Sequence, residues 1–249
     1  LKKIMHKLKQ LKNQYFQDLH QKDNQSSLVE EFNFIFLGQS VLKYKVPLDV
    51  FHTINDIYEK RRNELYPANK QLVGKIKNEH SLFFDGPNNN KMTTHNHLPQ
   101  NVLQWFKDKF QHYIKWNKIN VHQMHLNSIW VNEMREHEYN PIHIHQGTLF
   151  TGLSSVMILK LPQQTGEEYS ASDKPMNGRL QIIGNSSGQF ANSDYSPDVQ
   201  ERDFYVFPYD MRHCVYPFNG TKEKRRTLVC NVDVDYNPVS SRTAGGQLE

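Results

Sequence analysis

Apolar residues recur at helical spacing in three segments of the first half of the chain. Residues 1–21 carry an apolar residue every three or four positions, with lysines between them, and this predicts an amphipathic helix. A polar stretch, QKDNQSS, follows and is typical of a linker. Residues 47–65 and 99–117 show the same periodicity with more aromatic residues. They predict two further helices, each with one buried face.

Strand-like runs separate these helices and dominate the second half of the chain. Within 32–46, FNFIFL and VLKYKV flank GQS, which predicts a hairpin. Residues 66–96 mix short apolar runs with polar ones, and we expect loops with a little strand. Two polar loops, 163–177 and 185–201, have the length of lids or mobile segments. Strands are expected at 121–134, 141–145, 149–161, 178–184, 203–208, 213–218 and 225–236.

Helices followed by many short strands favour a mainly β fold with helices packed outside it. At 249 residues the chain is long enough for one sizeable domain with a complete core. We expect an N-terminal helix and linker at 1–30 and a helical and hairpin support region of the same domain at 31–120. The β core should then occupy 121–240, with a tail at 241–249.

Composition narrows the classes of partner. The net charge of +4 is small and the two signs are mixed, so nucleic acid is not favoured, although the basic first helix leaves it open. That helix could equally pack on the main domain or form a homodimer. Only Cys214 and Cys230 occur, which favours reduced cysteines in a cytoplasmic protein. No apolar run approaches a membrane span, and the lysine-rich start lacks the apolar core of a signal peptide.

Three histidines are the candidate metal ligands. His143 and His145 lie two apart in a predicted strand, so they can face one point, while Ile142 and Ile144 would enter the opposite, apolar layer. His213 follows an aromatic strand and a Pro-Tyr-Asp turn that could aim it inward. A lone His-x-His is a weak signal, because this chain carries histidines elsewhere. The third histidine makes a metal site the better interpretation.

The motifs around these histidines resemble a known family. WVNEMREHEYNPIHIHQGTLFTGLSSVMILKLP and RDFYVFPYDMRHCVYPFNGTKEKRRTLVCNVDV are similar to the two halves of the core of 2-oxoglutarate/Fe(II)-dependent oxygenases. In particular they resemble a prolyl-hydroxylase-like subfamily with a His-x-His motif. The resemblance covers about residues 125–235. It implies a double-stranded β-helix, a jelly-roll or cupin-like barrel with iron at its open end.

The resemblance assigns roles residue by residue. His143 matches the first iron ligand and His213 the distal ligand, while His145 stands where most of the superfamily has Asp or Glu. Arg226 matches the residue that pairs with the far carboxylate of 2-oxoglutarate, which leaves Arg225, on the opposite face, as the natural control. Further candidates for co-substrate contact or the edge of the site are Asn132, Asn231, Thr151, Tyr139, Tyr209 and Asp210. Trp130 is expected in the core.

The implied activity is an Fe(II)- and 2-oxoglutarate-dependent hydroxylation that consumes O2 and releases succinate and CO2. The substrate stays open between a peptidyl side chain, such as a prolyl residue, and a small molecule. One alternative is a cupin-type dioxygenase that uses three histidines and no 2-oxoglutarate. The other is a non-catalytic barrel that binds a partner.

Overall fold

The computed structural model describes residues 38–89, 91–168, 175–185, 188–189, 191 and 193–236. The helix expected at 1–21, the first strand of the hairpin expected at 32–46 and the tail at 241–249 lie outside the described residues. The two described helices are α2 (Leu48–Arg61) and α3 (Gln100–Trp116). The strands are β1 (Leu42–Lys45), β2 (Asn78–Ser81), β3 (Phe84–Asn88), β4 (Lys91–Thr94), β5 (Val121–Met134), β6 (Asn140–His143), β7 (Gly152–Lys160), β8 (Leu180–Ile183), β9 (Asp194–Tyr195), β10 (Asp203–Pro208), β11 (Arg212–Val215) and β12 (Arg225–Tyr236).

The strands form two large antiparallel sheets in jelly-roll order. One sheet has the order β1-β10-β7-β12-β5-β2, and the other has the order β6-β11-β8-β9. Along the chain from β5 to β12, the strands pass back and forth between the two sheets, which is the connectivity of a double-stranded β-helix. The expected mainly β fold with flanking helices is therefore confirmed. The two sheets are not hydrogen-bonded to each other into a closed barrel among the described strands.

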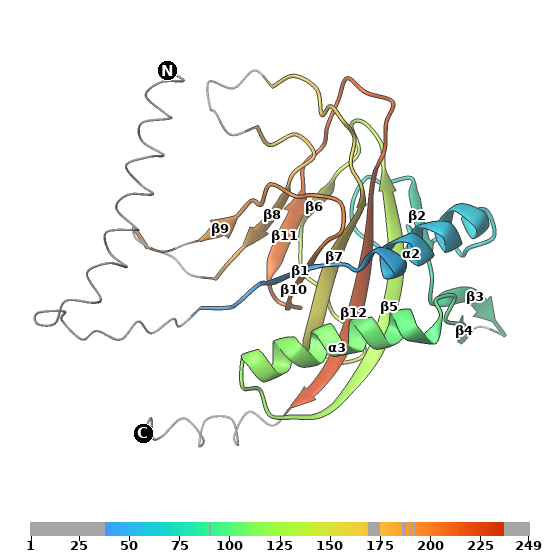
Figure 1. Ribbon diagram of the computed structural model, residues 1–249, viewed down its shortest axis with the longest axis vertical. Helices are drawn as coiled ribbons and strands as arrows, with labels where there is room; N and C mark the ends of the chain where they lie inside the picture. The colour runs from blue at the N-terminus through green and yellow to red at the C-terminus, as the bar shows by residue number, and fades with distance from the viewer. Residues whose placement is uncertain are drawn as a thin grey trace, which may run out of the picture. The chain divides into compact units, whose positions relative to one another are not determined.

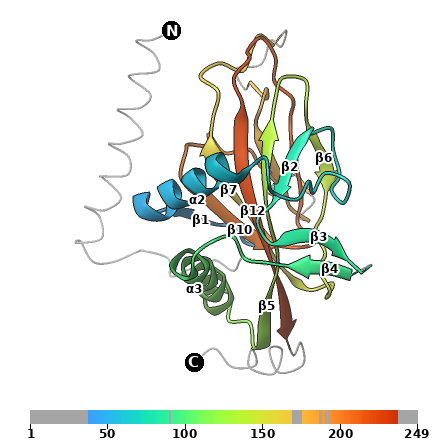
Figure 2. The same ribbon diagram turned by 90° about the vertical axis from the view of Figure 1, so that its right-hand side faces the viewer.

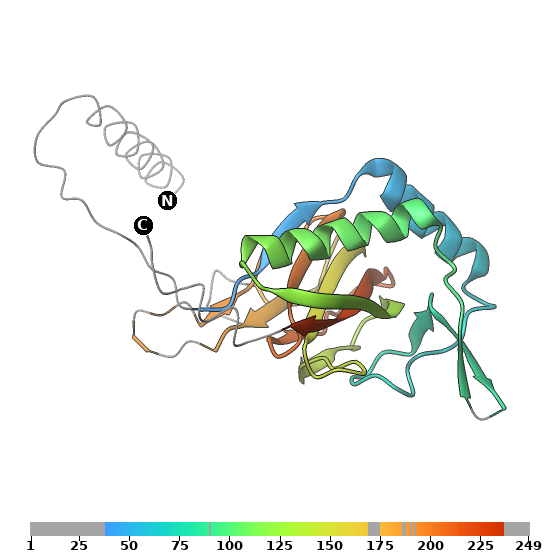
Figure 3. The ribbon, with the colours of Figure 1, turned by 90° about the horizontal axis from the view of Figure 1, so that it is seen from below.

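Both helices cover the same face of the six-stranded sheet. Figure 1 shows α2 and α3 lying across β5, β12 and β7, and Figure 2 shows the smaller sheet on the far side of these strands. Each helix begins after a proline, Pro47 or Pro99, whose missing N–H costs nothing at a helix start. The largest apolar cluster joins the helices to this sheet face, and includes Ile54 and Phe106. The layer order of helix, sheet, sheet can also be followed in Figure 3.

A second apolar cluster fills the space between the two sheets. Val156 and Ile158 of β7, Tyr205 and Phe207 of β10 and Leu180 of β8 belong to it. Alternate residues of each long strand therefore serve two different cores, one toward the helices and one toward the barrel interior. This alternation decides which side chains of β12 reach the interior.

Local expectations differ in outcome within the part of the chain that the structure describes. β1 pairs with β10, and the strand expected to form a hairpin with it lies outside the described residues. Residues 66–96 contain the short strands β2, β3 and β4 between loops, as expected. The strand expected at 141–145 ends at His143. Ile142 and Ile144 do not enter an apolar layer: they are 60% and 55% exposed. Among the described strands, β6 is the edge strand of the four-stranded sheet.

Two expectations from composition can also be compared with the structure. Cys214 and Cys230 are both free and buried, so the chain carries no disulfide between them. Among the described residues, no helix is both long enough and apolar enough to cross a bilayer.

Candidate functional site

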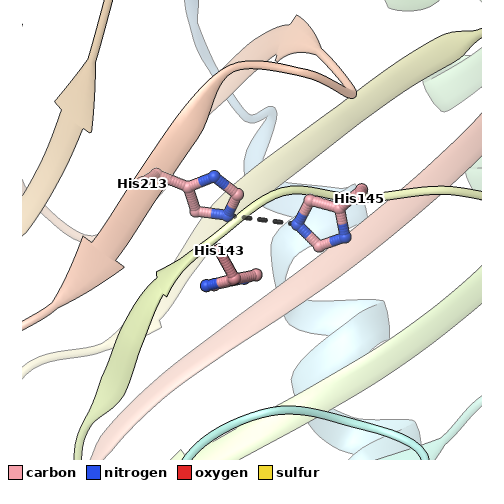
Figure 4. Close-up of side chains that lie close together, drawn as sticks. All are labelled: His143, His145 and His213. Carbon is pink, nitrogen blue, oxygen red and sulfur yellow. Dashed lines mark hydrogen bonds between the residues drawn. The ribbon is translucent and has the colours of Figure 1, made fainter.

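The structure brings the three predicted histidines together. His143 of β6 is the direct cross-strand partner of His213 of β11, and their ring centroids are 4.2 Å apart. His145 lies just past the end of β6, where its backbone N–H donates to the carbonyl of Tyr209 at 2.9 Å. This bond turns the chain so that His145 faces the pair. Figure 4 shows the three imidazoles converging from β6, the segment after it and β11.

Hydrogen bonds fix which ring nitrogen of each strand histidine faces the cluster. His143 Nδ1 lies 2.7 Å from the carbonyl oxygen of Pro141, and His213 Nδ1 lies 3.0 Å from that of Met211. A carbonyl only accepts, so each Nδ1 carries the proton and donates. The Nε2 lone pairs of both rings are therefore available to a metal, and a carbonyl partner of this kind is the usual outer support of a ligating histidine.

Burial keeps the cluster neutral. Burial, with the neighbouring His143, lowers the pKa of His213 to about 3. Burial, with the other two histidines, lowers the pKa of His145 well below its ordinary value, and burial lowers that of His143. Neutral imidazole is the form that binds a metal, so these shifts favour ligation at neutral pH.

Asn231 of β12 supports the third histidine. Its Nδ2 lies 3.2 Å from His145 Nδ1, and His145 Nε2 lies 3.1 Å from His213 Nε2. In this arrangement the proton of His145 sits on Nε2 and is shared with His213. Rotation of the Asn231 amide by 180° would present Oδ1, which has no hydrogen-bond partner, to an Nδ1–H of His145. That rotation would free His145 Nε2 for a metal.

The donor set fits a divalent transition metal. One ligand atom from each histidine can be chosen so that all three lie within 4.8 Å of one another. Two nitrogens bound to the same metal at right angles are about 3 Å apart, which matches the 3.1 Å between His145 and His213. No carboxylate joins this cluster within the described residues. The set is therefore three histidines rather than two histidines and a carboxylate.

Asp233 holds the segment that follows His145. Its Oδ2 accepts the backbone N–H groups of Thr148 and Leu149 at 3.0 and 3.3 Å, and its Oδ1 accepts the hydroxyl of Tyr209 at 3.1 Å. Gly147 passes so close that an added Cβ would lie 1.8 Å from Asp233 Oδ1. The glycine and the buried carboxylate together fix the path of the chain beyond His145.

The structure does not bring Arg226 to the histidines. Arg226 lies on the helix-facing side of β12, where Nη2 contacts Glu133 at 2.6 Å and Glu59 of α2 at 2.5 Å. Its guanidinium stacks over Tyr58, 4.6 Å from the ring centroid. The faces expected for the two arginines are therefore reversed. Arg226 shares its face of β12 with Leu228, Cys230 and Val232, which belong to the apolar cluster packed against the helices.

Arg225 lies on the interior face instead. It shares that face with Thr227, Val229, Asn231 and Asp233, which alternate along β12. Arg225 is 2% exposed, its Nε and Nη2 have no hydrogen-bond partner, and no ion pair within the described residues includes it. Burial lowers its pKa to about 10, so the group still carries its charge at neutral pH. A buried cation without a partner is costly, and an anion bound in the interior would relieve that cost.

The other predicted residues divide between the interior and the surface. Asn132 is buried on the interior face, opposite Thr227, and its Oδ1 has no partner. Thr151 and Asp210 line a different cavity. Thr151 donates a hydrogen bond to the carbonyl of Val234 at 2.7 Å, and Asp210 accepts one from Gln39. Tyr139 is 41% exposed and does not line the cavity at the histidines.

A cavity of about 360 Å³ opens beside His143 and His145. Trp130 lines it, with its ring centroid 5.9 Å from that of His145, so this residue belongs to the site as well as to the core. Glu79 also lines the cavity and is 3% exposed. No sequence signal pointed to Glu79, because β2 reads NEHS and lacks the alternation of apolar residues that marks a half-buried strand. Its remaining lining includes Tyr66, Leu72, Phe84, Ser128 and Asn231.

Comparisons with known proteins bear on this site. Residues 128–231 match the model of a family described as "Putative 2OG-Fe(II) oxygenase". A prolyl-4-hydroxylase from Pseudomonas putida has a TM-score of 0.49 and 12% identity, over 80% of this chain and 93% of that one. A prolyl hydroxylase from Trichoplax adhaerens, in complex with a hypoxia-inducible-factor peptide, has a TM-score of 0.47 and 11% identity, over 84% and 88%. No curated protein matches the chain.

The match to the family model contains all three histidines, Asn231 and both arginines of β12. Its description implies Fe(II), 2-oxoglutarate and O2, and the three histidines form a potential site for the metal. Over residues 128–231 the chain therefore resembles the 2OG-Fe(II) oxygenases, as its motifs indicated.

Proposed function

We propose that the protein is an Fe(II)- and 2-oxoglutarate-dependent hydroxylase that acts on a peptidyl side chain or a small molecule, releasing succinate and CO2. The observation that carries the proposal is the convergence of three neutral histidines inside the segment that matches the family model. Two of them have Nδ1 bound to backbone carbonyls and Nε2 turned to the cluster. A constellation of this kind has few uses other than holding a metal.

In this proposal the residues divide the work. His143, His145 and His213 hold the iron, and Asn231 orients His145 from behind. Bound Fe(II), together with 2-oxoglutarate, supplies the oxidative chemistry that activates O2. The protein supplies position, a dry interior and fixed charges. The ring of Phe207 packs on His213 at 4.8 Å and excludes water from one side of the cluster.

We assign the far carboxylate of 2-oxoglutarate to Arg225 rather than to Arg226. Arg225 is the buried arginine on the interior face, and its two unpaired nitrogens suit the two oxygens of a carboxylate. Thr227 lies on the same face one step toward the histidines, so its hydroxyl can share that carboxylate. Arg225 and Asn231 are six steps apart along β12, which is about 20 Å. Arg225 lines a cavity with Leu161 and Val199 rather than the cavity beside His143 and His145, so in this proposal 2-oxoglutarate extends from the histidines along β12 to reach it.

A three-histidine dioxygenase that uses no 2-oxoglutarate is the second candidate. The observation that favours it is the ligand set itself, because no carboxylate joins the three histidines in the described part of the chain. The buried, unpaired Arg225 argues against it, because an enzyme without an anionic co-substrate has no use for a buried cation.

Product analysis tests the proposal. The full chain would be incubated with Fe(II), O2 and 2-oxoglutarate, and succinate would be measured with and without candidate substrates. We expect slow succinate formation that requires iron and stops in His213→Ala, while His125→Ala, a change at an exposed histidine, leaves it unaltered. Iron binding without any succinate would favour the second candidate. Absence of iron binding would leave a non-catalytic barrel.

A further inference from the structure

The cavity beside the histidines contains a carboxyl group that no described residue binds. Glu79 lies on β2, the edge strand of the six-stranded sheet, directly opposite Asn132 of β5. Directly paired residues point to the same side of a sheet, so Glu79 shares the interior face with Asn132. The side chain is 3% exposed, and its Oε1 is buried without a hydrogen-bond partner.

The described residues around Glu79 make its surroundings acidic and include no cation paired with it. Burial, reinforced by the nearby Glu138 carboxylate, raises the pKa of Glu79 to about 8. Glu138 itself accepts the backbone N–H groups of Lys77 and Arg135, at 3.0 and 2.7 Å, so its carboxyl group is held in place. Within the described residues, no arginine or lysine forms an ion pair with Glu79 or Glu138. A pKa of about 8 leaves Glu79 mostly protonated at neutral pH when the cavity is empty. A cation that entered the cavity would favour the carboxylate form, so its binding would release a proton from Glu79.

Aromatic side chains form the walls around this carboxyl. Tyr66, Phe84 and Trp130 line the same cavity, together with the apolar side chain of Leu72. Gly86 allows the β3–β4 hairpin to approach Tyr66, because an added Cβ would lie 2.9 Å from the ring. The indole Nε1 of Trp130 is buried without a partner, which marks a second unsatisfied polar group at the site. Aromatic faces beside a carboxylate are a suitable receptor for an alkylammonium or guanidinium group.

Building on the proposed function, we infer that the cavity beside His143 and His145 binds a substrate group that carries a cationic nitrogen on an apolar stem. The carboxylate of Glu79 pairs with the cation, and Trp130, Tyr66 and Phe84 pack around the stem. Glu79 then acts as a specificity-determining residue, while the reaction at the histidines is unchanged. A lysyl or arginyl side chain, or a simple amine of that shape, has this chemistry.

Binding of matched probes to the full chain tests the inference. The probes are Nα-acetyl-lysine amide and Nα-acetyl-arginine amide, compared with Nα-acetyl-norleucine amide, which has a similar stem and no charge. Affinities would be measured by saturation-transfer NMR on metal-free protein. We expect at least one cationic probe to bind about tenfold more tightly than norleucine, and Glu79→Gln to abolish that preference. Glu136→Gln, at an exposed carboxylate of the neighbouring turn, should retain it.

Any other result of the probe-binding measurement overturns the inference. Equal binding of all three probes, absence of binding, or a preference that survives Glu79→Gln would show that Glu79 does not select a cation. The Glu79→Gln side chain has the same shape and no charge to bury, and thermal unfolding would verify its fold. Iron binding is measured separately. If the protein binds iron but shows no preference for the cationic probes, the inference is wrong and the proposed function stands. If the protein prefers the cationic probes but binds no iron, only the proposed function is wrong.

Discussion

Arg225 and Arg226 are consecutive residues of β12, and their guanidinium groups lie on opposite faces of the sheet in opposite electrostatic surroundings. Arg226 is bound by Glu133 and Glu59 on the helix side. Arg225 is equally buried on the interior side, with two nitrogens unpaired. The first arginine therefore completes a structural ion-pair network. The second is a buried cation that the described part of the fold leaves without an acidic partner.

Removing Arg226 should cost stability rather than co-substrate binding. In Arg226→Ala, the buried carboxylate of Glu133 loses its most deeply buried cationic partner, and breaking a buried pair in this way costs about 3 kcal/mol. We expect urea unfolding to show that loss, while the dissociation constant for 2-oxoglutarate stays within about twofold of wild type under conditions where the variant is folded. A stable variant that fails to bind 2-oxoglutarate would restore Arg226 to the site.

The same network should make stability depend on pH. Burial raises the pKa of Glu133, but hydrogen bonds from Lys224 and Arg226 outweigh it, so its pKa in the folded state lies below the ordinary 4.5. A depressed carboxyl pKa adds stability above pH 4.5, and that stability is lost as pH falls through the folded value. Glu133→Gln should therefore be less stable than wild type at pH 7, and the difference should shrink below pH 4.5. A difference that is constant over this range would contradict the network.

Replacing a predicted ligand should abolish metal binding. His143→Ala or His213→Ala removes one of three converging nitrogens, and the remaining pair cannot hold Fe(II) at micromolar protein concentrations. His125→Ala is the matched control, because that histidine is exposed on β5 and does not belong to the three-histidine cluster. Iron content after anaerobic gel filtration measures the effect. Stoichiometric iron in His213→Ala would exclude this cluster as the site.

Asn231 should affect the metal through His145. Its amide is the only described side chain that contacts His145 Nδ1, and loss of such an outer partner typically weakens metal binding by about 10- to 100-fold. We expect Asn231→Ala to show that loss in a competition assay with a chelating dye. Asn231→Asp, which can only accept from Nδ1–H, should bind at least as tightly as wild type. Weak metal binding by Asn231→Asp would contradict the orientation in which Asn231 Oδ1 accepts the Nδ1–H of His145.

The sequence was most informative where periodicity is strong and local. The strands at 121–134, 203–208 and 225–236 were predicted with the bounds that the structure shows, because each run contains β-branched or aromatic residues and is bordered by polar or turn residues. The meeting of His143 with His213 was also predicted. It needed the resemblance to a known family, because nothing in the spacing of 70 residues says that two strands pair.

Arg226 was expected on the interior face of β12, although the residue pattern of this strand places Arg225 there. Leu228, Cys230 and Val232 place the apolar, helix-facing side on even-numbered positions, which puts Arg225 in step with Asn231 on the odd ones. Asn231 was also expected near the site, and a strand that turns Asn231 to the interior turns Arg225 to the interior as well. Glu79 is different, because its burial arises from long-range packing of a short edge strand, which leaves no pattern in its own four residues.

In the proposed function, a metal at the three histidines and the guanidinium of Arg225 hold the two ends of one 2-oxoglutarate molecule. An anaerobic titration of Fe(II)-loaded protein with 2-oxoglutarate, followed through the visible charge-transfer band of the chelate, tests it most directly. The account predicts a saturable band in wild type and in Arg226→Ala, and at least tenfold weaker 2-oxoglutarate binding in Arg225→Gln with iron retained. A band that is unchanged in Arg225→Gln and lost in folded Arg226→Ala would contradict it.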